Sequence, residues 1–200
     1  MKKLLLLLVF IFNSLCISQT AKDYFFIGKE KYKEGKYYEA IKYYSRAIEL
    51  DPNYVDAYYY RGNVKAQLGE YYGAIEDYNK SIELNPNYAA AYFNRGNAKV
   101  DLKDYNGAIN DYNKAIELNP NYTEAYNNRG IAKYNLLDYN GAINDYSKTI
   151  ELNPNYAEAY LNRGITKLIL GNKKGGCLDL SKAGELGKEK AYEVIRIYCK

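Results

Sequence analysis

The sequence predicts an all-α solenoid of stacked antiparallel helix pairs, with about five 34-residue repeats and a C-terminal capping helix. Two observations predict this fold. The string Asn-Pro-Asn-Tyr occurs at equal intervals, at Asn85–Tyr88, Asn119–Tyr122 and Asn153–Tyr156, and Asp51–Tyr54 is a variant one step earlier. Glycines recur with the same step, at Gly28, Gly62, Gly96, Gly130 and Gly164. A fixed period of this length indicates units that bury their apolar faces by stacking on one another.

The N-terminal segment 1–18 is expected to lie outside the repeat array. Lys2 and Lys3 are followed by the apolar run Leu4–Phe12 and then by small residues up to Ser18. This pattern is typical of a secretory signal peptide cleaved after Ser18. A membrane anchor is an alternative, but the apolar run is short for one, and lipid attachment through Cys16 is another. We therefore expect an exported protein, periplasmic or secreted.

The remaining chain divides at the repeat period into five units and a last helix. The units are 21–54, 55–88, 89–122, 123–156 and a divergent 157–187, together the array 21–187, followed by a capping helix in 188–200. In each unit two stretches show apolar residues at helical spacing. In the third unit they predict a first helix from about Ala90 to Leu102 and a second from about Asn106 to Leu118.

Local signals predict where these helices begin and end. Pro120 ends the second helix of its unit, because proline has no N–H and clashes with the preceding turn. Asp104 and Asp138 are expected to cap second helices through their carboxylates. Asn121 stands three residues before Glu124, a spacing that predicts a capping box at the next first helix.

Small and aromatic residues recur at matching places of the two helices. The repeated glycines of the first helix and the alanines Ala40, Ala74, Ala108 and Ala142 of the second are expected to let the helices approach closely. Tyrosines at four further repeat positions are expected to fill the larger gaps. The 26 tyrosines are therefore interpreted mainly as architecture.

These features resemble the tetratricopeptide repeat, which has a 34-residue period, an aromatic–glycine pair four residues apart such as Tyr92 and Gly96, a later alanine and a terminal proline. The resemblance covers nearly all of the chain after Ser18. It implies a right-handed superhelix whose first helices line a concave groove, and a non-catalytic scaffold or adaptor that binds a protein or peptide there. Arg61 and its repeats stand where the family often has leucine, and Lys65 and its repeats where it often has an aromatic residue.

The resemblance also implies which residues face the groove. The aromatic candidates are Phe25, Phe26, Tyr59, Tyr60 and Phe93, and the amide candidates are Asn63, Asn94, Asn97, Asn128 and Asn162. An amide both donates and accepts, so a row of asparagines can pair with a peptide backbone of any sequence. Asn94, Asn128 and Asn162 resemble the asparagine ladder of some family members. The alternative is that these asparagines form an ordinary solvated helix face.

Other function classes have little support in the sequence. The chain has no histidine, the commonest general base and metal ligand, and no motif for a phosphate loop or a zinc site, so no catalytic residue, metal or cofactor is expected. A net charge of +4 gives no argument for nucleic acid. Glu76 and Asp77, on a second helix, are expected to be solvated. A small-ligand or glycan binder and a structural subunit whose groove holds a neighbouring chain are the alternative functions.

Two cysteines remain beyond Ser18. If the last two helices pack antiparallel, Cys177 lies opposite Cys199 and the two are expected to form a disulfide, which an oxidising compartment would preserve. Two free thiols are the alternative.

Overall fold

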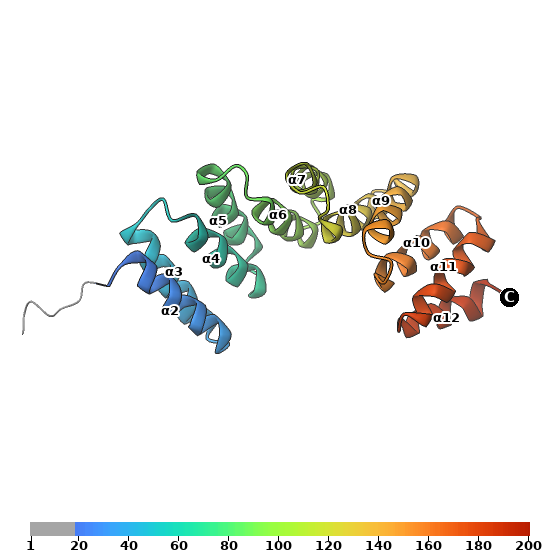
Figure 1. The fold of residues 1–200 in the computed structure, drawn as a ribbon, viewed down its shortest axis with the longest axis horizontal. Helices are drawn as coiled ribbons and strands as arrows, with labels where there is room; N and C mark the ends of the chain where they lie inside the picture. Colours follow the sequence, from blue (N-terminus) through green and yellow to red (C-terminus); the bar gives the residue numbers. More distant parts are fainter. Residues whose placement is uncertain (1–18) are drawn as a thin grey trace, which may run out of the picture.

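The computed structural model describes residues 19–200, and in this range it consists of α-helices and the short turns between them. The expected signal peptide and Cys16 lie outside the described residues. The helices follow one another as antiparallel pairs along an elongated array, with α2 at one end and α12 at the other (Figure 1). The predicted all-α solenoid is confirmed. Within residues 19–200, every helix is too short or too polar to span a membrane.

Eleven helices are described, five pairs and a last single helix. The first helices of the pairs are α2 (Ala21–Lys33), α4 (Val55–Gln67), α6 (Ala89–Asp101), α8 (Thr123–Asn135) and α10 (Ala157–Ile169). The second helices are α3 (Tyr37–Leu50), α5 (Tyr71–Leu84), α7 (Tyr105–Leu118), α9 (Tyr139–Leu152) and α11 (Lys173–Glu185), and α12 (Glu189–Tyr198) follows. In the third unit both helices begin one residue earlier than the periodicity predicts.

The helix ends show which capping signals the chain uses. The carboxylates of Asp104 and Asp138 accept hydrogen bonds from the N–H groups of the residues three positions on, at 2.9 Å, as predicted. The predicted capping box of Asn121 with Glu124 was wrong. The N-cap residue of α8 is Tyr122, without a side-chain cap, while the Asn121 N–H donates to the side chain of Asn119. Because α8 starts one residue later than the box requires, Glu124 cannot reach back to the cap.

Each unit is closed by a glycine of the first helix that lies against a large side chain of the second. A Cβ atom placed on Gly96 would lie 2.7 Å from the ring of Tyr112, closer than atoms can pack. Tyr112 is 1 % exposed, and Ala108 beside it is fully buried. Glycine therefore lets the phenol ring lie directly on the backbone of the first helix. In the fifth unit, Leu180 takes the place of the tyrosine against Gly164.

The curvature of the array follows from which helices approach their equivalents. Consecutive first helices α4, α6, α8 and α10, and then α12, contact one another directly. No comparable contact links the second helices within residues 19–200. The first helices are therefore closer together and lie on the inner side of the curve, where a concave surface forms.

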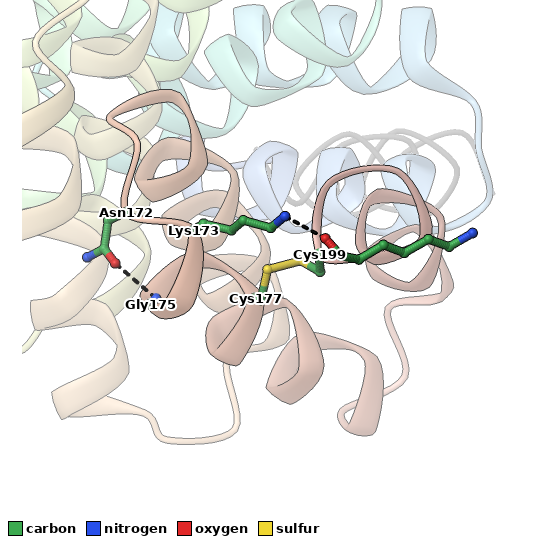
Figure 2. The surroundings of a disulfide bond; sticks show 6 residues. Asn172, Lys173, Gly175, Cys177 and Cys199 are labelled. Atoms are coloured by element: carbon green, nitrogen blue, oxygen red, sulfur yellow. Dashed lines mark hydrogen bonds between the residues drawn. A yellow bond between two sulfur atoms is a disulfide. The ribbon is translucent and has the colours of Figure 1, made fainter.

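The last helix closes the C-terminal end. Ala191 is fully buried, and Val194 and Ile195 pack on the apolar cluster of Leu161 and Leu180. The sulfur atoms of Cys177 and Cys199 are 2.02 Å apart and form a disulfide between α11 and the end of α12 (Figure 2). The bridge joins cysteines with a sequence separation of 22, so it ties α12 to the array.

Candidate functional site

Units two to five each bury an aspartate of the second helix between two cations of the first helix. Asp111 accepts from Arg95 Nε at 2.9 Å and Nη2 at 2.5 Å, and its other neighbour is Lys99 Nζ at 2.8 Å. The bidentate geometry fits the planar guanidinium. We call this group the buried ion cluster of the unit. The equivalent clusters are Arg61, Lys65 and Asp77; Arg129, Lys133 and Asp145; and Arg163, Lys167 and Asp179.

This arrangement corrects the expectation that Asp77 is solvated. Asp77 is 3 % exposed, whereas Glu76 beside it is exposed as expected. The partners of Asp77, Arg61 and Lys65, stand on another helix, so the periodicity of one helix does not show them. The signal was the joint repetition of Arg, Lys and Asp at fixed offsets in four units. The cluster joins the two helices of a unit, and its cations are therefore already paired within the protein.

Most of the aromatic groove candidates are buried or half-buried and pack on other aromatic side chains of the array. Phe25 is 5 % exposed and packs on Tyr44, Tyr54 and Tyr60. The ring centroids of Tyr59 and Phe93 are each 4.8 Å from the tyrosine that ends the same unit, Tyr88 and Tyr122 respectively. These side chains turn toward the junction between units because that position of the first helix faces the next pair.

Phe26 and Tyr60 are placed differently. Phe26 is 49 % exposed, with the ammonium groups of Lys22 and Lys29 5.9 Å and 6.0 Å from the centre of its ring. Tyr60 is half-buried, between Phe25 and Tyr59. Phe26 is thus the aromatic candidate with a largely free surface, at the N-terminal end of the array.

The asparagine candidates form hydrogen bonds from one unit to the next. The Nδ2 of Asn94 donates to Asn63 Oδ1 at 2.9 Å and to Tyr59 Oη at 3.0 Å. The Nδ2 of Asn128 donates in the same way to Asn97 Oδ1, at 2.9 Å. We call these four asparagines the amide ladder. The structure brings them together as two pairs, while the side chain of Asn162 lines a hollow further along.

Buried tyrosines hold the ladder from beneath. The hydroxyls of Tyr78 and Tyr112 donate to the same Oδ1 atoms, of Asn63 and Asn97, at 2.8 Å. Burial raises the pKa of Tyr78 and of Tyr112, so both hydroxyls stay protonated as donors. With each Oδ1 accepting two bonds, the Nδ2 groups of Asn63 and Asn97 and the Oδ1 of Asn94 have no further hydrogen bond within residues 19–200, and the three side chains line one hollow.

A chain of four hollows runs along the first helices, and we call it the groove. The first, about 330 Å³, is lined by Tyr32, Asn63, Ala66, Gln67, Tyr78, Asn94, Asn97, Ala98 and Asp101. The second, about 200 Å³, is lined by Asn97, Val100, Asp101, Tyr112, Asn128 and Ile131. The third, about 260 Å³, is lined by Ile131, Tyr134, Asn135, Tyr146, Glu158, Asn162 and Ile165, and the fourth, about 280 Å³, by Ile165, Leu168, Ile169, Val194 and Tyr198.

Neighbouring hollows share residues, so the groove is continuous. Asn97 and Asp101 belong to the first and second, Ile131 to the second and third, and Ile165 to the third and fourth. Its character changes along the array, from amides over units two and three to aliphatic side chains over unit five and α12. A continuous groove of this kind has the shape for an extended chain rather than for a compact molecule.

Comparisons with known proteins agree with this geometry. The model of the TPR repeat family matches residues 28–69, 62–103, 96–136 and 138–171. A comparison with curated proteins gave no match. A crystal structure of MamA is similar, with 30% identity and a TM-score of 0.78, over 83% of this chain and 97% of that one.

Two further similar structures are of TPR proteins described with a peptide-binding site or a bound peptide. YrrB, a TPR protein with an unusual peptide-binding site, is 25% identical with a TM-score of 0.76, over 88% of this chain and 92% of that one. The first TPR domain of Spaghetti (RPAP3), bound to the HSP90 peptide SRMEEVD, is 32% identical with a TM-score of 0.58, over 58% of this chain and 93% of that one. The fold is therefore that of a protein-interaction scaffold, and the chain belongs to the tetratricopeptide repeat family.

Proposed function

We propose that this chain is a non-catalytic scaffold that binds an extended segment of a partner protein in the groove. The observation that carries the proposal is the half-satisfied amide ladder. Its internal bonds fix the orientation of each amide, and they leave donors on Asn63 and Asn97 and an acceptor on Asn94 facing the groove. A peptide backbone presents the complementary carbonyl and N–H groups whatever its side chains.

Preorganisation of the ladder supports binding rather than mere solvation. Each of these side chains is already held by two hydrogen bonds. It therefore loses little rotational freedom when a ligand arrives, and less of the binding free energy is spent on ordering it. A solvated face would not need buried tyrosines beneath its amides. The buried ion clusters add to this by holding each groove helix against its partner.

The alternatives have less support. A small-ligand or glycan binder was based on an aromatic cluster, but Phe25, Tyr59 and Phe93 pack inside the array. A structural subunit would place a neighbouring chain in the same groove, so it differs in the partner and not in the site. We also propose that the protein acts outside the cytoplasm, supported by the pattern of residues 1–18 and by the disulfide.

Site-specific photo-crosslinking in the producing cell tests the groove directly. Gln67 lines the first hollow and is exposed, whereas Glu76 is exposed on the second helix of the same unit. We expect a photoreactive residue at Gln67 to capture a partner protein, and the same residue at Glu76 to capture none. Equal capture from both positions, or capture from Glu76 alone, would move the binding surface away from the groove.

A pair of double variants then tests the ladder against that captured partner. Asn94→Ala with Asn128→Ala removes ladder amides, and we expect about tenfold weaker binding, the loss of about one net hydrogen bond, with the helical spectrum unchanged. Asn79→Ala with Asn113→Ala is the matched control. These asparagines also accept an arginine hydrogen bond, but they lie on second helices, away from the groove. The control should bind normally, and equal affinity of all three proteins would refute the role of the ladder.

A further inference from the structure

Charge along the groove is one-sided. Among the residues that line the four hollows, the charged ones are Asp101 and Glu158, and both are acids. Glu158 is compensated, because its carboxylate forms an ion pair with Lys188. Asp101 is exposed and lines two hollows, and its carboxylate makes no hydrogen bond or ion pair within residues 19–200. A negative charge without a partner therefore lies beside the amide ladder.

The nearest cations of the same helix do not offset this charge. Arg95 and Lys99 are on α6 with Asp101, but both are held by Asp111 in the buried ion cluster of the unit. Of the lysines of α2, Lys22 and Lys29 lie over aromatic rings, and Lys31 and Lys33 form ion pairs with Glu34 and Glu30. None of the four lines a hollow. The ion clusters thus leave the middle of the groove acidic although the whole chain carries a net charge of +4.

The other end of the groove is apolar. The fourth hollow is lined entirely by aliphatic side chains and Tyr198, and of these Ile169 and Tyr198 are 48 % and 57 % exposed. The third hollow continues it through Ile131 and Ile165. Exposed aliphatic surface next to a polar groove is typical of a site that accepts apolar side chains of a ligand.

Resting on the proposed function, we propose that the partner segment is basic and aliphatic: a lysine or arginine lies over Asp101, and large aliphatic side chains occupy the third and fourth hollows. Neighbouring helices pack about 10 Å apart, so Asp101 on α6 and the hollow between α10 and α12 are separated by about 25 Å, or about seven extended residues. An acidic segment is disfavoured, because its carboxylate would meet Asp101 in a groove whose four hollows are lined by no cation.

Fluorescence anisotropy with labelled peptides and the purified protein tests this chemistry. Each probe is a serine and glycine peptide in which one lysine is separated from a pair of leucines by about seven residues. The lysine precedes the leucines in one probe and follows them in the other. In companion peptides, glutamate replaces the lysine or serines replace the leucines. One order of the lysine peptide should bind about fivefold tighter than its glutamate companion, as expected for a single exposed ion pair, and the serine companion should bind at least about tenfold more weakly.

Protein variants assign each preference to its place. Asp101→Asn should abolish the preference for lysine over glutamate, while Glu117→Gln, an exposed acid of the same unit on α7, should keep it. Ile169→Ser should weaken the leucine peptide and leave its serine companion unchanged. Leu178→Ser, at an exposed leucine on the second helix α11, is the control. Because the substituted side chains are exposed, loss of folding is not expected, and the helical spectrum checks it.

The outcomes separate this inference from the function on which it rests. Equal or tighter binding of the glutamate peptides, or a lysine preference that survives in Asp101→Asn, would overturn the basic–aliphatic assignment. If no peptide binds while Gln67 still crosslinks a partner, the assignment fails and the groove function stands. If Gln67 captures no partner either, both proposals fail.

Discussion

Replacing the buried aspartate of one ion cluster should destabilise the array strongly. Asp111 is 3 % exposed and is contacted by Arg95 and Lys99 at 2.5 to 2.9 Å. Asp111→Asn keeps the shape of the side chain but leaves two cations facing each other without an anion. Breaking a fully buried ion pair costs about 3–5 kcal/mol. The two cations keep 18% and 21% of their side-chain surface exposed, so partial hydration reduces the expected cost to about 2–3 kcal/mol.

The first unit has apolar residues at two of the three cluster positions, and at the third position Lys31 pairs with Glu34 instead. Ile27 and Tyr43 stand there at the positions of Arg95 and Asp111. A variant with Arg95→Ile and Asp111→Tyr, combined with Lys99→Met so that no cation is left without an anion, is an apolar copy of this kind. Because replacing a buried ion pair by packed apolar residues is often neutral, we expect this variant to lie within about 1 kcal/mol of the unaltered protein and to be more stable than Asp111→Asn.

Urea unfolding followed by far-ultraviolet circular dichroism measures both variants. Glu117→Gln is the control, because the pair of Glu117 with Lys114 is exposed on the same helix and should contribute less than about 0.5 kcal/mol. The reasoning is refuted if Asp111→Asn unfolds like the control, or if the apolar copy is less stable than Asp111→Asn. Either result would mean that solvent compensates the cations.

Three further predictions concern stability. Leu137 has a positive φ of 64° at a position where three other units have glycine, and its side chain is 68 % exposed. Because glycine adopts this conformation without strain, Leu137→Gly should raise the free energy of unfolding, measured in urea, by about 1 kcal/mol. Burial raises the pKa of Tyr122 to about 12. In the unfolded chain the phenol loses its proton near a pH of about 10. The contribution of protonated Tyr122 to the free energy of unfolding is therefore complete below that pH and is lost as the pH rises toward the folded-state pKa. Loss of helical signal and appearance of tyrosinate absorbance should coincide in that range. Reducing the bond between Cys177 and Cys199 should cost about 3 kcal/mol locally, seen as faster hydrogen exchange in α12; two alkylatable thiols in the unreduced protein would contradict the bridge.

Much of the fold was predictable because each local sequence signal occurs in several units. Gly96 and Tyr112 recur with their neighbours at one step, so the helix pairs, their breaks and their stacking follow from periodicity and from the properties of glycine and proline. The exact start of α8 did not follow, because Asn121 was a plausible cap and only the hydrogen bonds show that the cap residue is Tyr122.

The site was predictable in part. The asparagines were singled out from their positions, and the structure joins four of them in two hydrogen-bonded pairs. The destination of Phe25, Tyr59 and Phe93 was not predictable, because position along one helix does not say whether a side chain turns to the groove or to the junction with the next unit. The prediction that Asp77 is solvated was wrong for the same reason, because its partners are on another helix.

The sequence alone thus determined the architecture: a fixed repeat period, with small and aromatic residues at constant positions within it, admits little else than stacked helix pairs. The tertiary structure decided which charges and amides are used up inside the protein and which are left for a ligand. That division depends on contacts between different helices, such as those of Lys167 with Asp179 and of Asn94 with Tyr59, and such contacts exist only once the helices have packed.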